Sequence, residues 1–167
     1  CLTEKQVTAL KKIYSGPRNA KGELMVPGFL PGGETGPAGW TAWITGAAPM
    51  RAAQFFFASQ TERNMIHNDS AWDIKSFNLD SDGKLANEKL APVLNATDVD
   101  LKAFRAHGGK LILYHGWSDA ALAPTNTIHY YESVVARMGR REVESFLRLY
   151  MVPGMQHCGG GPGPDSF

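Results

Sequence analysis

Two short apolar segments joined by an amphipathic helix constrain the fold of this chain more than any other feature. Residues 110–114 (KLILY) and 145–152 (SFLRLYMV) have the length and apolar character of buried strands. The segment between them carries apolar residues at helical spacing, namely Ile128, Tyr131, Val135 and Met138. A strand, a helix and a strand connected over this length are typical of a right-handed parallel unit. The fold class is therefore predicted to be α/β.

The first part of the chain has a different character. Residues 3–15 are predicted to form a helix with Thr3 as the N-cap. The following stretch is rich in glycine and proline, and two prolines within residues 25–33 exclude a central strand there because they lack backbone donors. We expect residues 1–98 to form an irregular, mainly helical and aromatic-rich unit, and residues 99–167 to form the α/β unit.

The overall composition excludes several classes of function. Lys and Arg together number 17 and Asp and Glu 16, with no basic block, so a nucleic-acid partner is not expected. No apolar run approaches the roughly 20 residues needed to span a bilayer, so a membrane partner is not expected either. The chain begins with Cys1, and no signal-peptide pattern follows, so we expect further chain upstream. Cys1 and Cys158 permit one disulfide without establishing it.

The segments that follow the two predicted strands carry the chemistry. The first strand is followed by HGWSD, which ends in Asp119, and the second by PGMQHCGGG, which contains His157. Because the carboxyl ends of parallel strands share one edge of a sheet, both residues are expected on the same side. A carboxylate that orients an imidazole is the supporting part of a catalytic triad, and Asp precedes His in α/β-hydrolases. We predict a distance of about 2.6 to 3.2 Å between a carboxylate oxygen of Asp119 and Nδ1 of His157.

Other interpretations of these residues remain open. A loop aspartate is commonly a cap or solvated, and a loop histidine is commonly structural. A metal site formed by His115, Asp119 and His157 is also conceivable, because imidazole and carboxylate are ordinary zinc ligands. Farther upstream, residues 78–83 imitate the start of an EF-hand loop, but Lys89 stands where that loop needs a bidentate Glu. No calcium is therefore expected at that segment.

Three motifs together resemble the tannase/feruloyl esterase family of serine esterases. They are LILYHGWSDAALAP, the helix with Tyr130-Tyr131, and VPGMQHCGGG; the opening CLTEKQVTALKKIYSGP resembles the later part of the family's lid domain. The resemblance implies that residues 1–98 are part of a lid and that residues 99–167 are the C-terminal portion of an α/β-hydrolase sheet. It implies that Asp119 is the triad acid and His157 the triad base.

The resemblance also implies that much of the catalytic apparatus lies outside this chain. The family's nucleophile motif, a Cys-Ser pair followed by glycines, is absent, as is the lid calcium loop, which would lie upstream of Cys1. Cys158 would form a disulfide with the cysteine before the nucleophilic Ser, and Cys1 would also pair with a cysteine outside the chain. We therefore expect a fragment that is inactive alone and whose partner is the missing N-terminal half.

For the intact protein, the resemblance implies a serine carboxylesterase that hydrolyses feruloyl-type or galloyl-type aromatic esters. The implied disulfides suggest a secreted or periplasmic location, since disulfides persist in oxidising compartments. Trp40, Trp43 and Leu122 are candidates for contact with the aromatic acyl group, although a place in the lid core is the more common role for such tryptophans. The alternative is a non-catalytic fragment or diverged member that only binds an aromatic ligand or a partner chain. No cofactor or metal is expected within the chain.

Overall fold

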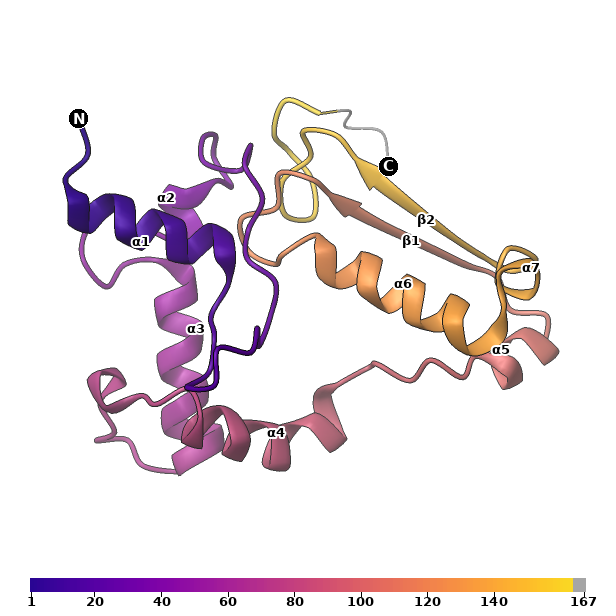
Figure 1. Cartoon of the computed structure of the whole chain (residues 1–167), viewed down its shortest axis with the longest axis horizontal. Helices are drawn as coiled ribbons and strands as arrows, with labels where there is room; N and C mark the ends of the chain where they lie inside the picture. Colours follow the sequence, from indigo (N-terminus) through magenta and orange to yellow (C-terminus); the bar gives the residue numbers. More distant parts are fainter. Residues whose placement is uncertain (164–167) are drawn as a thin grey trace.

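The computed structural model of this chain describes residues 1–163 and contains a lid-like helical part and an α/β part (Figure 1). The helical part comprises α1 (Glu4–Ser15), α2 (Trp40–Trp43), α3 (Ala53–Thr61), a π-helical turn (Glu62–His67), a 3-10 turn (Ile74–Ser76) and α4 (Ser81–Leu94). The α/β part comprises α5 (Lys102–Ala106), β1 (Leu111–Gly116), α6 (Thr125–Met138), α7 (Arg140–Val143) and β2 (Leu147–Val152). An extended segment after α4 connects the two parts.

The two strands form a parallel pair, as predicted. Leu111 pairs with Leu147 and Gly116 with Val152, and α6 provides the crossover between the strands. β1 extends two residues beyond the predicted strand because His115 and Gly116 continue the pairing with β2. The prediction that the second strand begins at residue 145 was wrong, because the chain first turns through α7 and Phe146 donates its N–H to the carbonyl of Val143.

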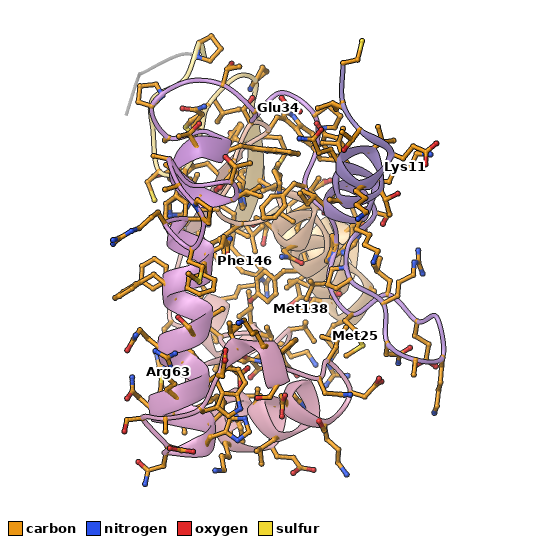
Figure 2. All side chains as sticks on the ribbon, turned by 90° about the vertical axis from the view of Figure 1, so that its left-hand side faces the viewer. Lys11, Met25, Glu34, Arg63, Met138 and Phe146 are labelled. Atoms are coloured by element: carbon orange, nitrogen blue, oxygen red, sulfur yellow. The ribbon has the colours of Figure 1, made fainter. Side chains whose placement is uncertain are left out.

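The core of the α/β part lies between the sheet and α6. The buried residues of this cluster come from α6, from α7 and from the chain entering β2, namely Val134, Met138, Val143, Phe146 and Leu147. Met138 and Phe146 point into the interior in Figure 2. Leu111 and Leu113 of β1 pack on the same cluster, because alternate strand residues face the same side. The core thus packs α6 against the first residues of both strands.

Capping and a tight turn define α1 as the sequence predicts. The Thr3 hydroxyl accepts a hydrogen bond from the backbone N–H of Gln6 at 3.3 Å, and the Gln6 side chain accepts one from the Thr3 N–H at 2.8 Å. Gly16 ends the helix with φ of 77°, and a Cβ atom there would lie 2.5 Å from the Val26 carbonyl oxygen. Only glycine fits this position without strain.

The EF-hand-like segment is the start of α4. Asn78 Oδ1 accepts hydrogen bonds from the N–H groups of Asp80 and Ser81 at 3.0 and 3.1 Å. Asp82 Oδ2 accepts one from Asn78 N at 2.6 Å. These side chains therefore satisfy backbone donors at the beginning of a helix, which is the ordinary use of Asn and Asp in such positions. Within residues 1–163, no helix has the length and apolar character needed to cross a membrane.

Candidate active site

Two loops meet at the carboxyl edge of the sheet. The loop after β1 carries Asp119 and the loop after β2 carries His157. Their backbones are joined by hydrogen bonds, because Ser118 N donates to the Met155 carbonyl at 3.1 Å. Gly116 permits this close approach, since a Cβ atom there would lie 2.1 Å from the Met155 oxygen. The two loops are thus fixed relative to each other by main-chain contacts.

Asp119 and His157 form a hydrogen-bonded pair at this edge. Oδ2 of Asp119 lies 3.0 Å from Nδ1 of His157, a distance within the range expected from the sequence. The other carboxylate oxygen, Oδ1, accepts hydrogen bonds from the N–H groups of Ala121 and Leu122 at 2.7 and 2.9 Å. Only 4% of the Asp119 surface is exposed. The structure therefore brings together the acid and base candidates around a buried carboxylate.

Hydrogen bonding keeps the Asp119 carboxyl group ionised despite its burial. Burial alone raises the pKa of a carboxyl group. At Asp119 the side chains of His115 and His157 and the N–H groups of Leu122 and Ala121 outweigh that effect and lower the pKa from 3.8 to about 2. A buried negative charge with four donors is well suited to orient and stabilise a protonated imidazole.

His115 is a second imidazole on the same carboxylate oxygen. The sequence suggested His115 only as an alternative metal ligand together with Asp119 and His157, and not as a hydrogen-bond partner of the acid. The Nε2 atom of His115 lies 3.0 Å from Oδ2 of Asp119, and its Nδ1 atom lies 2.7 Å from Oγ1 of Thr127 in α6. The sequence offers no signal for this role beyond the position of His115 four residues before the acid. Both imidazoles hydrogen-bond the same oxygen, Oδ2 of Asp119. Within residues 1–163, no group of three or more His, Cys, Asp or Glu is arranged to hold a metal ion.

The lid-like part contacts the candidate base directly. The rings of Trp43 and His157 meet in a T-shaped contact with centroids 4.9 Å apart and an interplanar angle of 74°. Phe57 of α3 stacks on Trp43 at 6.4 Å. Trp40, in contrast, is buried against Tyr14 with centroids 5.4 Å apart. Of the two tryptophans considered for the substrate, Trp43 therefore lies beside the base and Trp40 lies within the helical core.

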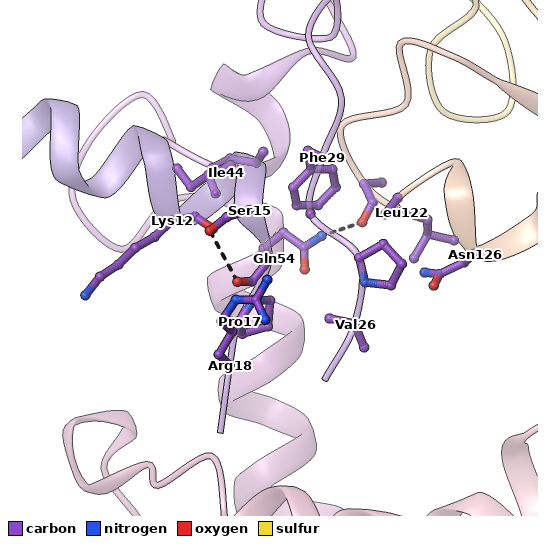
Figure 3. A pocket seen from close by; sticks show the side chains of 16 residues that line it. Lys12, Ser15, Pro17, Arg18, Val26, Phe29, Ile44, Gln54, Leu122 and Asn126 are labelled. Carbon is purple, nitrogen blue, oxygen red and sulfur yellow. Dashed lines mark hydrogen bonds between the residues drawn. The ribbon is translucent and has the colours of Figure 1, made fainter. Parts of the chain in front are cut away.

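Leu122 separates two hollows beside the acid. A small cleft of about 160 Å³ is lined by residues around the Asp119–His157 pair, including Leu122 and Cys158. A larger cavity of about 850 Å³ lies between α1, α3 and the acid loop and also includes Leu122 (Figure 3). Here Gln54 of α3 donates a hydrogen bond to the Ala121 carbonyl at 2.5 Å. Leu122 is 56% exposed, so its side chain is available to a ligand.

The two cysteines lie on the surface. Cys158 borders the small cleft directly after His157, and its backbone has a φ of 60°. Both Cys1 and Cys158 are exposed thiols within the described part of the chain. A positive φ at a residue other than glycine is uncommon and is tolerated where the surrounding structure fixes the backbone. The Cys158 thiol is therefore accessible beside the candidate base.

Gln156 joins the base loop to the lid-like part. It is 1% exposed, donates from Nε2 to the Thr35 carbonyl, and accepts at Oε1 from Ala38 N at 3.2 Å. Its backbone N–H also donates to the Gly160 carbonyl at 3.0 Å, which closes the loop around His157. The residue before the candidate base is therefore anchored on both sides of the loop.

We expect the substitution Gln156→Leu to lower the free energy of unfolding of the full-length protein by about 1 to 3 kcal/mol, because it leaves the Ala38 N–H and the Thr35 carbonyl without their partner. Urea unfolding followed by tryptophan fluorescence measures this loss. Gln60→Leu is the matched control and should lose less, since Gln60 is only half-buried and Asn64, the partner of its side chain, keeps its hydrogen bond to the Gln60 carbonyl. Equal stability of Gln156→Leu and the wild type would show that water replaces the side chain.

The fold and the paired acid and base place the chain among α/β-hydrolases, and comparison with known proteins defines the family. The model of the tannase and feruloyl esterase family matches residues 1–167, so the chain belongs to that family. The structure superposes on feruloyl esterase B from Aspergillus oryzae with a TM-score of 0.80 at 28% identity, covering 99% of this chain and 32% of that one.

Two sequence relatives agree with this assignment. An uncharacterized esterase from Xanthomonas campestris pv. campestris is 40% identical over all of this chain and 33% of its own length. The mono(2-hydroxyethyl) terephthalate hydrolase from Piscinibacter sakaiensis is 35% identical over all of this chain and 32% of its own length. The chain thus spans about a third of the curated relatives it matches.

Proposed function

We propose that the full-length protein containing this chain is a carboxylic ester hydrolase that uses a serine triad, with Asp119 as its acid and His157 as its base. The observation that supports this most directly is the 3.0 Å contact between Oδ2 of Asp119 and Nδ1 of His157. The nucleophilic serine belongs to the part of the protein outside this chain, since no G-x-S-x-G or Cys-Ser elbow occurs in the sequence.

The hydrogen bond defines how His157 acts in this mechanism. An ionised carboxylate only accepts, so Nδ1 of His157 carries the hydrogen and Nε2 is left with a lone pair. Nε2 takes the proton of the serine hydroxyl as the serine attacks the ester carbonyl, and returns it to the leaving alcohol. In the second half-reaction Nε2 takes a proton from the water that attacks the acyl-enzyme, and it returns this proton to the serine oxygen as the acid is released. Asp119 stabilises the imidazolium that forms in both steps.

The substrate class in this proposal is an ester of an aromatic acid. Trp43 makes a T-shaped contact with His157, and Leu122 is exposed at the cleft beside Asp119. A planar acyl group placed at the base would meet one aromatic and one aliphatic side chain, which suits a feruloyl or galloyl ring. Trp40 would support the lid from its buried position against Tyr14.

Further elements of the proposal lie partly outside the chain. Cys158 would form a disulfide with a cysteine next to the nucleophilic serine, for which its exposed thiol is accessible. Cys1 would pair with another cysteine of the full-length protein. A calcium site in the lid would lie upstream of Cys1. The location would be secreted or periplasmic, where such disulfides persist.

The test compares the full-length protein with the 167-residue chain. We expect the full-length protein to hydrolyse methyl ferulate or methyl gallate and the chain alone to give no turnover above background, because it lacks the nucleophile and the oxyanion-hole donors. Release of the free acid is followed by chromatography. Binding of methyl ferulate by the full-length protein without hydrolysis would favour a non-catalytic aromatic-binding protein. Turnover by the chain alone that survives His157→Ala would overturn the proposed mechanism.

A further inference from the structure

We propose that His115 is a positioning residue for the reaction, which holds the Asp119 carboxylate in the plane that His157 requires. This inference rests on the proposed esterase function. His115 is not expected to touch the substrate, since its two ring nitrogens are engaged by Asp119 and Thr127. It would therefore act entirely through the acid.

The main-chain hydrogen bonds of Asp119 leave its carboxylate free to rotate about χ2, and the hydrogen bond from His115 removes this freedom. Both main-chain donors, from Ala121 and Leu122, bind Oδ1. A carboxylate held at one oxygen can still turn about χ2, which is a broad and roughly twofold torsion. The second oxygen, Oδ2, receives Nε2 of His115 at 3.0 Å in addition to Nδ1 of His157 at 3.0 Å. Two donors on Oδ2 fix the plane of the group.

The ring of His115 is itself oriented by the scaffold. Because the carboxylate accepts only, Nε2 carries a hydrogen, and Nδ1 of the neutral ring accepts from the Thr127 hydroxyl at 2.7 Å. Thr127 lies in the first turn of α6, and His115 lies in β1, where it pairs with Met151 of β2. A hydrogen-bonded chain thus runs from the rigid helix and strand to an acid that sits in a loop, which is how a precise site is supported.

Packing alone is the competing explanation. The side chain of His115 is only 12% exposed, so it also fills space at the end of the strand. The two explanations differ in what they require of the residue. Packing needs only volume, whereas positioning needs a hydrogen-bond donor at the place of Nε2. Variants that separate volume from donor capacity therefore distinguish them.

In the full-length protein, we expect His115→Phe to lower kcat by roughly 10- to 100-fold with little change in KM, because supporting residues of this kind typically contribute that much. His115→Gln should recover most of the activity, since a glutamine amide can donate to Oδ2 of Asp119. Thr127→Val should give a smaller loss, because the ring keeps its contact with the carboxylate but loses its orientation. Thermal unfolding of each variant establishes that the fold persists.

A double-mutant cycle with Asp119→Asn supplies the decisive readout. If His115 acts through the acid, His115→Phe should cause little further loss once Asp119 is replaced. The same fold-loss in both backgrounds, or equal activities of the Phe and Gln variants, would overturn the inference in favour of packing. Failure of the inference is distinguishable from failure of the proposed function. If His115→Phe is fully active while Asp119→Asn is inactive, only the inference about His115 fails. If Asp119→Asn is fully active, the proposed function itself fails.

Discussion

Replacing His157 with alanine in the full-length protein is expected to lower kcat for ester hydrolysis by about a thousandfold or more, the loss typical of removing a triad member. The reason is geometric. Asp119 fixes Nδ1 of His157, so Nε2 is the only ring nitrogen of this residue left to take the proton from the nucleophile. KM should change little, since the imidazole contributes mainly to the transition state. Initial rates with methyl ferulate over a range of concentrations separate the two parameters.

His129→Ala is the matched control for this experiment. His129 lies on the exposed face of α6, away from the two loops, and its backbone contact to Ser133 does not depend on the ring. The control should retain the activity of the wild type. A loss below tenfold for His157→Ala would mean that another base accepts the proton, and would remove His157 from the triad.

The substitution Asp119→Asn is expected to lower kcat by up to about 10,000-fold, as the corresponding change does in a serine protease triad. The amide can present a hydrogen-bond donor to the ring, which favours the wrong tautomer, and the charge that stabilises the imidazolium is lost. Because the pKa of Asp119 is about 2, the wild-type carboxylate stays ionised over the whole working range of such an enzyme. The loss should therefore be similar at pH 5 and at pH 8, which a pH series of kcat measures.

Asp69→Asn provides a matched control for the aspartate. Oδ1 of Asp69 accepts from Ala71 N at 2.8 Å, just as Oδ1 of Asp119 accepts from Ala121 N at 2.7 Å. Asp69 is exposed and contacts neither imidazole of the site. Normal activity of Asp69→Asn beside an inactive Asp119→Asn would assign the effect to the position of the carboxylate. A variant Asp119→Asn that loses activity only at low pH would contradict the role proposed here.

The α/β part was largely predictable because its signals are local. The apolar runs and the helical spacing between them gave the parallel pair, and the edge rule brought Asp119 and His157 to one side. His115, Asp119 and His157 were considered together only as metal ligands, and the direct hydrogen bond from His115 to the acid was not predicted. That bond depends on how far β1 continues and on how the loop turns back. Neither property is encoded in the alternation of apolar and polar residues.

The helical part was predictable only where capping signals are strong. Thr3 and Gly16 define α1 by their own chemistry. The helix α4 was not recognised because its sequence carries Gly83 and Pro92 and lacks a clear apolar stripe, so tertiary contacts must outweigh local preference. Likewise, Trp40 and Trp43 were both named as candidates for contact with the acyl group, whereas one packs on Tyr14 and the other on His157.

The lid-like part touches both loops of the site. Gln54 donates to the acid loop, Trp43 contacts His157, and Ala38 donates to Gln156 of the base loop. For the proposed esterase, we therefore expect substrate preference and turnover to depend on the same contacts. Grafting the lid of one relative onto the hydrolase core of another would disturb the alignment of acid and base along with the choice of acyl group. Chimeras that transplant these three contacts together with the lid should recover rates that simpler exchanges lose. A change of specificity in such proteins would then need matching substitutions in the lid-like part and in the loop that it contacts.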